Sequence, residues 1–199
     1  MDRRYAPGIA GALFCVAIAF FPVVAKGEVP LLDGVDLGFH ELGHMLAMGF
    51  GRFIHTLAGS FLQIAVPLGL SAYFFVIRRD PVGAGVCAAW AGTSAYDVAI
   101  YVADAPFQRL PLIGGYHDWA YLLGPGELDA LAAAETIATV TRFFGALAIV
   151  AGILLCLRPP LAELLDRRRP ASLAKPTRVR TRRRWAPVED SEKEPSLSS

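Results

Sequence analysis

The sequence predicts an all-α, polytopic membrane protein with about four transmembrane helices, and three observations support this. The chain has 199 residues, of which 54% are hydrophobic, and its mean hydropathy is +0.44. Four segments are long and apolar enough to cross ~30 Å of hydrocarbon as helices. Ten of the nineteen basic residues fall between Arg158 and Arg184, directly after the last apolar run. We therefore expect a bilayer, and not water, around most of the chain.

The expected spans are residues 8–25, 56–77, 82–103 and 137–157. The first could instead be a cleavable signal peptide, because Arg3 and Arg4 precede it and Val23 and Ala25 suit the small-residue positions of a cleavage site. Its apolar run is longer than a usual signal core, which favours a retained anchor. The third span is rich in Gly and Ala, which predicts close contact with neighbouring helices and a central place in the bundle.

The segment Val35–Phe50 differs from the four spans. It has only about 16 residues and carries Asp36, His40, Glu41 and His44, each costly in hydrocarbon unless paired or hydrated. We expect a membrane-embedded helix that is re-entrant or interfacial. A fifth full span would place either the amino-terminal arginines or the basic tail on the wrong side of the membrane.

Positive charge predicts the orientation of the chain in the membrane. Arg3 and Arg4 precede the first span, Arg78 and Arg79 join the second to the third, and the basic tail follows the fourth. With four spans, all of these lie on the cytoplasmic side. The loop 105–135 then faces outward.

Composition divides the chain into a helical membrane domain, 1–157, and a tail, 158–199, that is first basic and then acidic. The tail has too little apolar surface to offset the entropy of ordering, so we expect it to be disordered and cytoplasmic. Its basic cluster favours anionic lipid head groups over nucleic acid as a partner. The three cysteines, Cys15, Cys87 and Cys156, lie apart in apolar stretches and are expected to be small buried hydrophobes.

The stretch "FHELGHMLAMGFG" at 39–51 contains the motif HExxH. On a helix, His40 and His44 lie on one face, one turn apart, so both imidazoles can reach one zinc ion. Glu41 can then take a proton from zinc-bound water and pass it to the leaving amine. A chain of this composition contains the motif by chance with a probability of about 0.3%. A metal-free polar cluster of the same three residues is the alternative.

A catalytic zinc usually takes three protein ligands, and spacing does not decide the third. His117, an imidazole in the outward loop, is the first choice. Asp104, Asp118 and Asp97 are the alternatives. Asp118 could instead orient a ligating imidazole, Asp104 could cap the end of its helix, and Asp97 could pair with Gln63.

Four stretches, "FHELGHMLAMGFGR", "AGSFLQIAVPL", "DVAIYVADA" and "LPLIGGYHDWAYLLG", together resemble a family of small bacterial membrane proteins related to the site-2 proteases, which are intramembrane zinc metallopeptidases. The resemblance covers roughly residues 33–150 and implies zinc held by His40 and His44, with Glu41 as the base. Site-2 proteases take their third ligand from an aspartate in an "LDG" motif after HExxH. Here the "LDG" at 32–34 precedes it, so that role is not transferred to Asp33.

The expected function is that of a membrane-embedded zinc metallopeptidase that hydrolyses peptide bonds at or in the bilayer. Two alternatives stay open. One is a non-catalytic membrane protein with a structural metal or a polar core. The other is a small ion transporter that uses the intramembrane carboxylates Asp97 and Asp104.

Overall fold

The computed structural model describes residues 5–25, 29, 31–112 and 115–167, and all regular structure within this part of the chain is helical. The helices are α1 (Ala6–Phe20) with the π-helical η1 (Phe21–Ala25), α2 (Leu32–Leu46), α3 (Arg52–Tyr73) with the π-helical η2 (Phe74–Arg78), α4 (Pro81–Asp104), α5 (Asp118–Leu123), the 3-10 helix η3 (Leu131–Ala133) and α6 (Ala134–Arg167). The all-α prediction is confirmed for the described residues. Residues 168–199, which hold most of the predicted tail, lie outside them.

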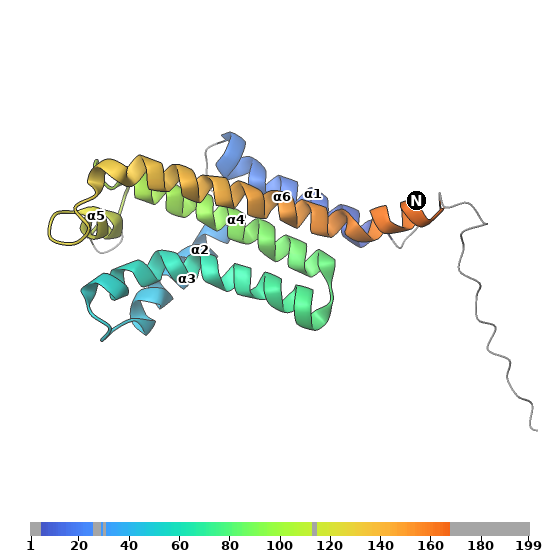
Figure 1. The fold of residues 1–199 in the computed structure, drawn as a ribbon, viewed down its shortest axis with the longest axis horizontal. Helices are drawn as coiled ribbons and strands as arrows, with labels where there is room; N and C mark the ends of the chain where they lie inside the picture. The colour runs from blue at the N-terminus through green and yellow to red at the C-terminus, as the bar shows by residue number, and fades with distance from the viewer. Residues whose placement is uncertain (1–4, 26–28, 30, 113–114, 168–199) are drawn as a thin grey trace, which may run out of the picture. The chain divides into compact units, whose positions relative to one another are not determined.

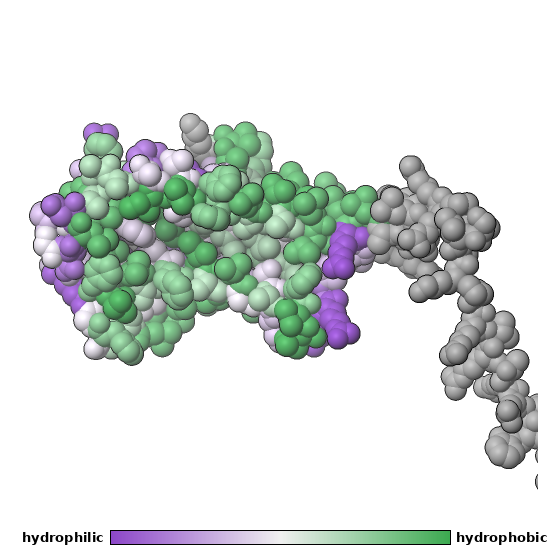
Figure 2. Space-filling model, in the orientation of Figure 1, coloured by the Kyte–Doolittle hydropathy of each residue, from purple (hydrophilic) through white to green (hydrophobic). Residues whose placement is uncertain are grey.

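Three helical segments are long and apolar enough to cross a membrane, namely Ala6–Ala25, Arg52–Arg78 and Leu131–Leu161. They match the first, second and fourth predicted spans. The third predicted span forms α4, which is not one of the three, so the count of four spans stays a prediction. Figure 2 shows apolar residues along the sides of the helices and hydrophilic residues gathered toward two ends.

Helix α4 lies against α1, α3 and α6, and twelve of its 24 residues are buried (Figure 1). Its glycines allow α6 to approach closely. A Cβ atom on Gly92 would lie 2.6 Å from the carbonyl oxygen of Gly145, and one on Gly85 would meet the carbonyl oxygen of Gly152. The central position predicted from the small residues of this segment is therefore confirmed.

Helices α2 and α3 form an antiparallel pair joined by a short turn (Figure 1). Gly49 and Gly51 have φ of +97° and +83°, a conformation that favours glycine, and so permit the turn. Within the pair, a Cβ atom on Gly43 would collide with the carbonyl oxygen of Ala58. The backbones are therefore in direct contact, which brings the HExxH face of α2 onto α3.

Asp36, in the first half of α2, connects this pair to α4. Its carboxylate is buried and accepts hydrogen bonds from Trp90 Nε1 at 2.7 Å and from Ser94 Oγ at 2.8 Å. Two donors meet the requirement that a buried carboxylate be hydrogen-bonded. The buried charge of Asp36 is thus accommodated by α4.

The two ends of the described helix bundle are formed by different elements (Figure 1). The start of α1, the turn between η2 and α4 and the later part of α6 share one end, where Gly8 approaches Cys156 and Pro160. The turn between α2 and α3, α5 and η3 share the other. Arg78 and Arg79 thus lie at the opposite end from α5, as the charge pattern predicts. Arg3 and Arg4 lie outside the described residues, and the orientation in a membrane stays a prediction.

Helix α6 continues through Pro159 and Pro160 to Arg167, past the end of the membrane domain predicted at Leu157. Among the cysteines, Cys15 and Cys156 are buried, with their Sγ atoms 3.9 Å apart, and Cys87 is half-buried.

Candidate metal centre

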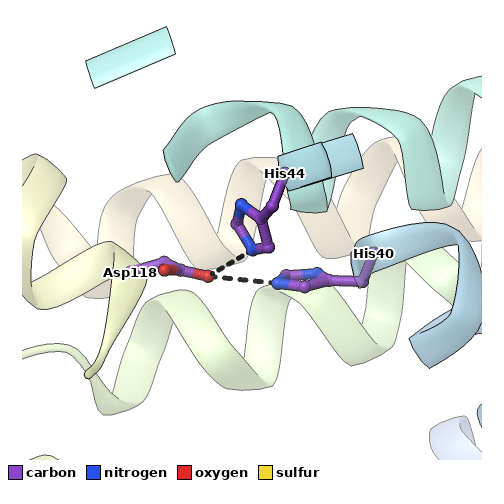
Figure 3. Close-up of side chains that lie close together, drawn as sticks. All are labelled: His40, His44 and Asp118. Atoms are coloured by element: carbon purple, nitrogen blue, oxygen red, sulfur yellow. Dashed lines mark hydrogen bonds and ion pairs between the residues drawn. The ribbon is translucent and has the colours of Figure 1, made fainter. Parts of the chain in front are cut away.

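Three side chains from distant parts of the chain meet at one point: His40 and His44 of α2, and Asp118, the first residue of α5 (Figure 3). Asp118 Oδ2 lies 3.1 Å from His40 Nε2 and 3.2 Å from His44 Nε2. The candidate ligand atoms all lie within 4.8 Å of one another. Around a tetrahedral zinc with bonds of about 2.0–2.2 Å, neighbouring ligand atoms stand about 3.3–3.6 Å apart. The two distances from Asp118 are therefore close to the spacing that one zinc ion requires, and the third separation is at most 4.8 Å.

Gln63 of α3 determines which nitrogen of His40 carries the ring proton. Its Nε2 donates to Asp97 Oδ2 at 2.6 Å, so its amide oxygen faces His40 Nδ1, at 3.1 Å. Because an amide oxygen only accepts, Nδ1 carries the proton and donates it. In the neutral ring the lone pair then lies on Nε2, the atom that faces Asp118.

His44 is oriented in the same way by the backbone of α3. Its Nδ1 donates to the carbonyl oxygen of His55 at 2.8 Å, while His55 Nδ1 donates to the carbonyl oxygen of His44 at 2.8 Å. The Nε2 atoms of both motif histidines are thereby directed at the same carboxylate oxygen. Two lone pairs and a negative charge repel one another unless a cation lies between them. This donor set fits a divalent metal.

Gly59 of α3 provides the space for the two rings. A Cβ atom at this position would lie 2.6 Å from His44 Nε2 and 2.7 Å from His40 Nε2. A larger residue would thus occupy the place where the ring nitrogens converge. Sequence reasoning missed this role, although the small-residue run Ala58–Gly59–Ser60 within an apolar helix is a signal of close approach.

Helix α5 is held against α3 and α4 by hydrogen bonds on both sides of the site. The backbone N–H of Asp118 donates to Tyr101 Oη at 2.9 Å, and Trp119 Nε1 donates to Ser60 Oγ at 3.0 Å. Neither Tyr101 nor Ser60 has a spacing in the sequence that would have marked it. Together the two bonds position the Asp118 carboxylate in front of the imidazoles.

His117, the first choice for the third ligand, does not join the group. Its Nδ1 accepts a hydrogen bond of 3.2 Å from the backbone N–H of Ala120 and so caps α5. Its Nε2 lies 3.4 Å from Asp104 Oδ2 but has no hydrogen-bond partner among the described residues, and its ring stacks on Tyr101 at 4.3 Å. Burial lowers the pKa of His117, against the opposing effect of Asp104. The adjacent residue, Asp118, takes the place that the sequence assigns to His117.

The remaining alternatives have other partners. Asp97 binds Gln63, which is the pairing considered from the sequence. Asp104 Oδ2 accepts hydrogen bonds from the backbone N–H groups of Arg109 and Leu110, at 2.9 and 3.0 Å, where the chain leaves α4. These two carboxylates support the surroundings of the site and do not meet the motif histidines.

Water has limited access to the centre. The side chains of His40, His44 and Asp118 are 10%, 15% and 18% exposed, and Glu41 is exposed. The helices thus shield the site from most of the surrounding solvent but leave it partly accessible. It can hold an ion and still admit water, which a hydrolytic site requires.

Comparison of the chain with protein-family models, with curated proteins and with solved structures gave no match. The relationship to the site-2 proteases stays a prediction. Asp33, the aspartate of the early "LDG" sequence, accepts a hydrogen bond from the backbone N–H of Val29 at 2.8 Å at the start of α2. It is not a member of the metal-ligand group.

Proposed function

We propose that the protein is a membrane-embedded zinc metallopeptidase that hydrolyses peptide bonds at or in the bilayer of a bacterial inner membrane. His40 and His44 would hold the ion through Nε2, and Asp118 through Oδ2. The observation that carries the proposal is the convergence of two imidazoles, each with its Nδ1 proton engaged elsewhere, on one carboxylate oxygen. Catalytic zinc sites have three protein ligands and leave one position open, whereas structural sites have four.

Zinc bound there would supply a Lewis acid that polarises a carbonyl group and lowers the pKa of a water molecule. Glu41 adjoins His40 and has an exposed side chain, so it can receive the proton of the attacking water and deliver it to the leaving amine. Gln63 and the carbonyl group of His55 hold the two rings in position throughout. The surrounding helices limit the entry of bulk water, since the side chains of His40, His44 and Asp118 are only 10%, 15% and 18% exposed.

A metal-free polar core is the second candidate, and one observation favours it. A separation of 3.1 Å between His40 Nε2 and Asp118 Oδ2 is also that of a protonated imidazole bound to a carboxylate. A proton between His40 Nε2 and Asp118 Oδ2 would then replace the zinc ion. The two candidates differ in metal content, so metal analysis separates them.

Metal content and hydrolysis measured on the same preparations test the proposal. The purified full-length protein should contain about one zinc per chain, and Glu41→Gln should contain as much, because Glu41 is not a ligand. In proteoliposomes supplied with a mixed peptide library, Glu41→Gln should reduce hydrolysis by about 10²- to 10⁴-fold, the usual contribution of a general base.

Glu135→Gln is the matched control, because Glu135 is an exposed glutamate that pairs with Arg142 on α6. It should retain both zinc and hydrolysis. A wild-type protein that takes up no zinc on dialysis would contradict the proposal and support the polar core. Undiminished hydrolysis by Glu41→Gln would remove Glu41 from the role of base.

A further inference from the structure

A cavity of about 280 Å³ adjoins the metal-ligand group. Its walls include Arg52 and Thr56 from the start of α3, and Tyr116, Asp118 and Tyr121 from the segment that contains α5. Asp118 belongs both to this cavity and to the group with His40 and His44. A molecule in the cavity would therefore lie against a residue that also faces an ion held by that group.

Arg52 supplies a positive charge to the wall of this cavity. Its guanidinium carbon lies 4.2 Å from the centre of the Tyr121 ring, a cation–π contact that holds the group in place. The hydroxyl group of Tyr121 donates to Glu127, and Arg52 forms no ion pair among the described residues. The guanidinium thus keeps its donors for a ligand.

We infer that Arg52 forms a carboxylate-binding subsite, which selects peptides carrying a carboxylate close to the bond that is cleaved; this inference rests on the proposed function. A guanidinium presents paired N–H donors that match the two oxygens of a carboxylate. Among the side chains that line the cavity, Arg52 is cationic and Asp118 is anionic, and a divalent ion held by Asp118 would add two positive charges. The carboxylates of Glu41, Asp104 and Glu127 lie nearby but outside this lining. At the Arg52 guanidinium an anionic group is therefore favoured over a cationic one.

The size of the cavity limits the distance between that carboxylate and the scissile bond. A sphere of 280 Å³ is about 8 Å across, the length of about two extended residues. The selected carboxylate is then either the carboxyl terminus of the peptide or an aspartate or glutamate side chain within about two residues of the bond. Both sources offer the same group to Arg52.

Small hydroxamates test the subsite without requiring hydrolysis. The full-length protein in zwitterionic nanodiscs is loaded with cobalt(II), whose visible spectrum reports hydroxamate binding. Succinic acid monohydroxamate, which carries a carboxylate, is compared with the same molecule bearing a carboxamide. The carboxylate form should bind at least about tenfold more tightly to the wild type, as expected for a charge-assisted hydrogen bond. Arg52→Gln should make the two affinities equal, and Arg52→Lys should restore part of the difference.

Arg109→Gln is the matched control, because Arg109 lies over Phe107 at 4.9 Å and is not part of the cavity wall. It should keep the wild-type preference for the carboxylate form.

Peptide binding to Glu41→Gln then separates the two sources of the carboxylate, the carboxyl terminus and an internal side chain. Tight binding that is lost on amidation of the carboxyl terminus assigns the terminal carboxylate, and binding restored by an internal aspartate assigns a side chain.

The outcomes separate failure of the inference from failure of the proposed function. Equal affinity of the two hydroxamates for the wild type would overturn the subsite and leave the metal site intact. A preference that disappears in nanodiscs containing phosphatidylglycerol would assign Arg52 to lipid phosphate and overturn the peptide subsite. A protein that binds neither cobalt nor hydroxamate would overturn both.

Discussion

Among individual residues, Asp118 decides whether an ion is held, because it supplies the oxygen that both imidazoles face. We predict that Asp118→Asn weakens zinc binding by at least about 100-fold, since loss of supporting residues alone costs about 10- to 100-fold. Chelator competition on the purified protein measures the affinity. His117→Asn is the control, because asparagine can still cap α5. Loss of zinc from His117→Asn, with retention in Asp118→Asn, would instead favour His117 as the ligand.

Gln63 is predicted to act on the metal through His40. Gln63→Leu removes the acceptor for His40 Nδ1 and the donor to Asp97, so the ring is no longer held with its Nε2 toward Asp118. Zinc affinity should fall by about 10- to 100-fold. Ser71→Ala is a matched control in the same helix, where Ser71 Oγ donates to the carbonyl oxygen of Ala84 away from the site. An unchanged affinity in Gln63→Leu would show that the ring keeps its orientation without this acceptor.

The sequence predicts the two histidines of the site more securely than the third ligand, for a physical reason. His40 and His44 share one helix face by spacing alone. Asp118 lies 78 residues after His40, and its approach depends on how α5 docks on α3 and α4. His117 is the N-cap of α5, and Asp118 is the first residue of the helix. This difference in position gives the two neighbouring side chains different contacts. The amino-acid sequence alone does not show which of these two adjacent residues faces the histidines.

At the scale of helices, the contact between α2 and α3 depends on Gly59. Gly59→Ala should displace both imidazoles, because the added Cβ atom would lie 2.6 Å and 2.7 Å from their Nε2 atoms. We expect zinc content to fall to near zero, measured on protein purified without added metal. Gly69→Ala is the control in the same helix, since nothing lies within 4 Å of its Cβ position.

Gly69→Ala should also raise the stability of α3 by about 0.5–1 kcal/mol through the helix propensity of alanine, because its Cβ position is open. Thermal unfolding in detergent measures this. Full zinc content in Gly59→Ala would mean that α2 and α3 can move apart enough to fit both imidazole rings. It would contradict the role of Gly59 in forming the site.

Element positions were predictable where the hydrophobic pattern is long. The segments expected at 56–77 and 82–103 correspond to Arg52–Arg78 and Pro81–Asp104, because each apolar run fills several helical turns. Helix α5 has six residues, less than two turns, so no periodicity can reveal it. That short helix delivers the third candidate ligand, which explains why the fold was more predictable than the site.

At the scale of the whole described bundle, one end carries the candidate metal centre and the other carries a basic turn. The cavity, α5 and the start of α3 are together at the first end, and Arg78 and Arg79 lie at the second. Two of the three candidate spans, Arg52–Arg78 and Leu131–Leu161, run between these ends (Figure 1). If positive residues stay on the cytoplasmic side, substrates reach the candidate site from outside.

Cysteine accessibility tests this orientation. In a background with alanine at Cys15, Cys87 and Cys156, Leu128→Cys reports the end with α5 and Arg78→Cys reports the basic turn, where Arg79 still supplies positive charge. Leu128 is 55% exposed, and Arg78 is also exposed. A membrane-impermeant maleimide should label Leu128→Cys in intact cells and Arg78→Cys only after permeabilisation. The reverse pattern would place the metal centre toward the cytoplasm, because the described helices keep the two reporters at opposite ends whichever way the bundle is inserted.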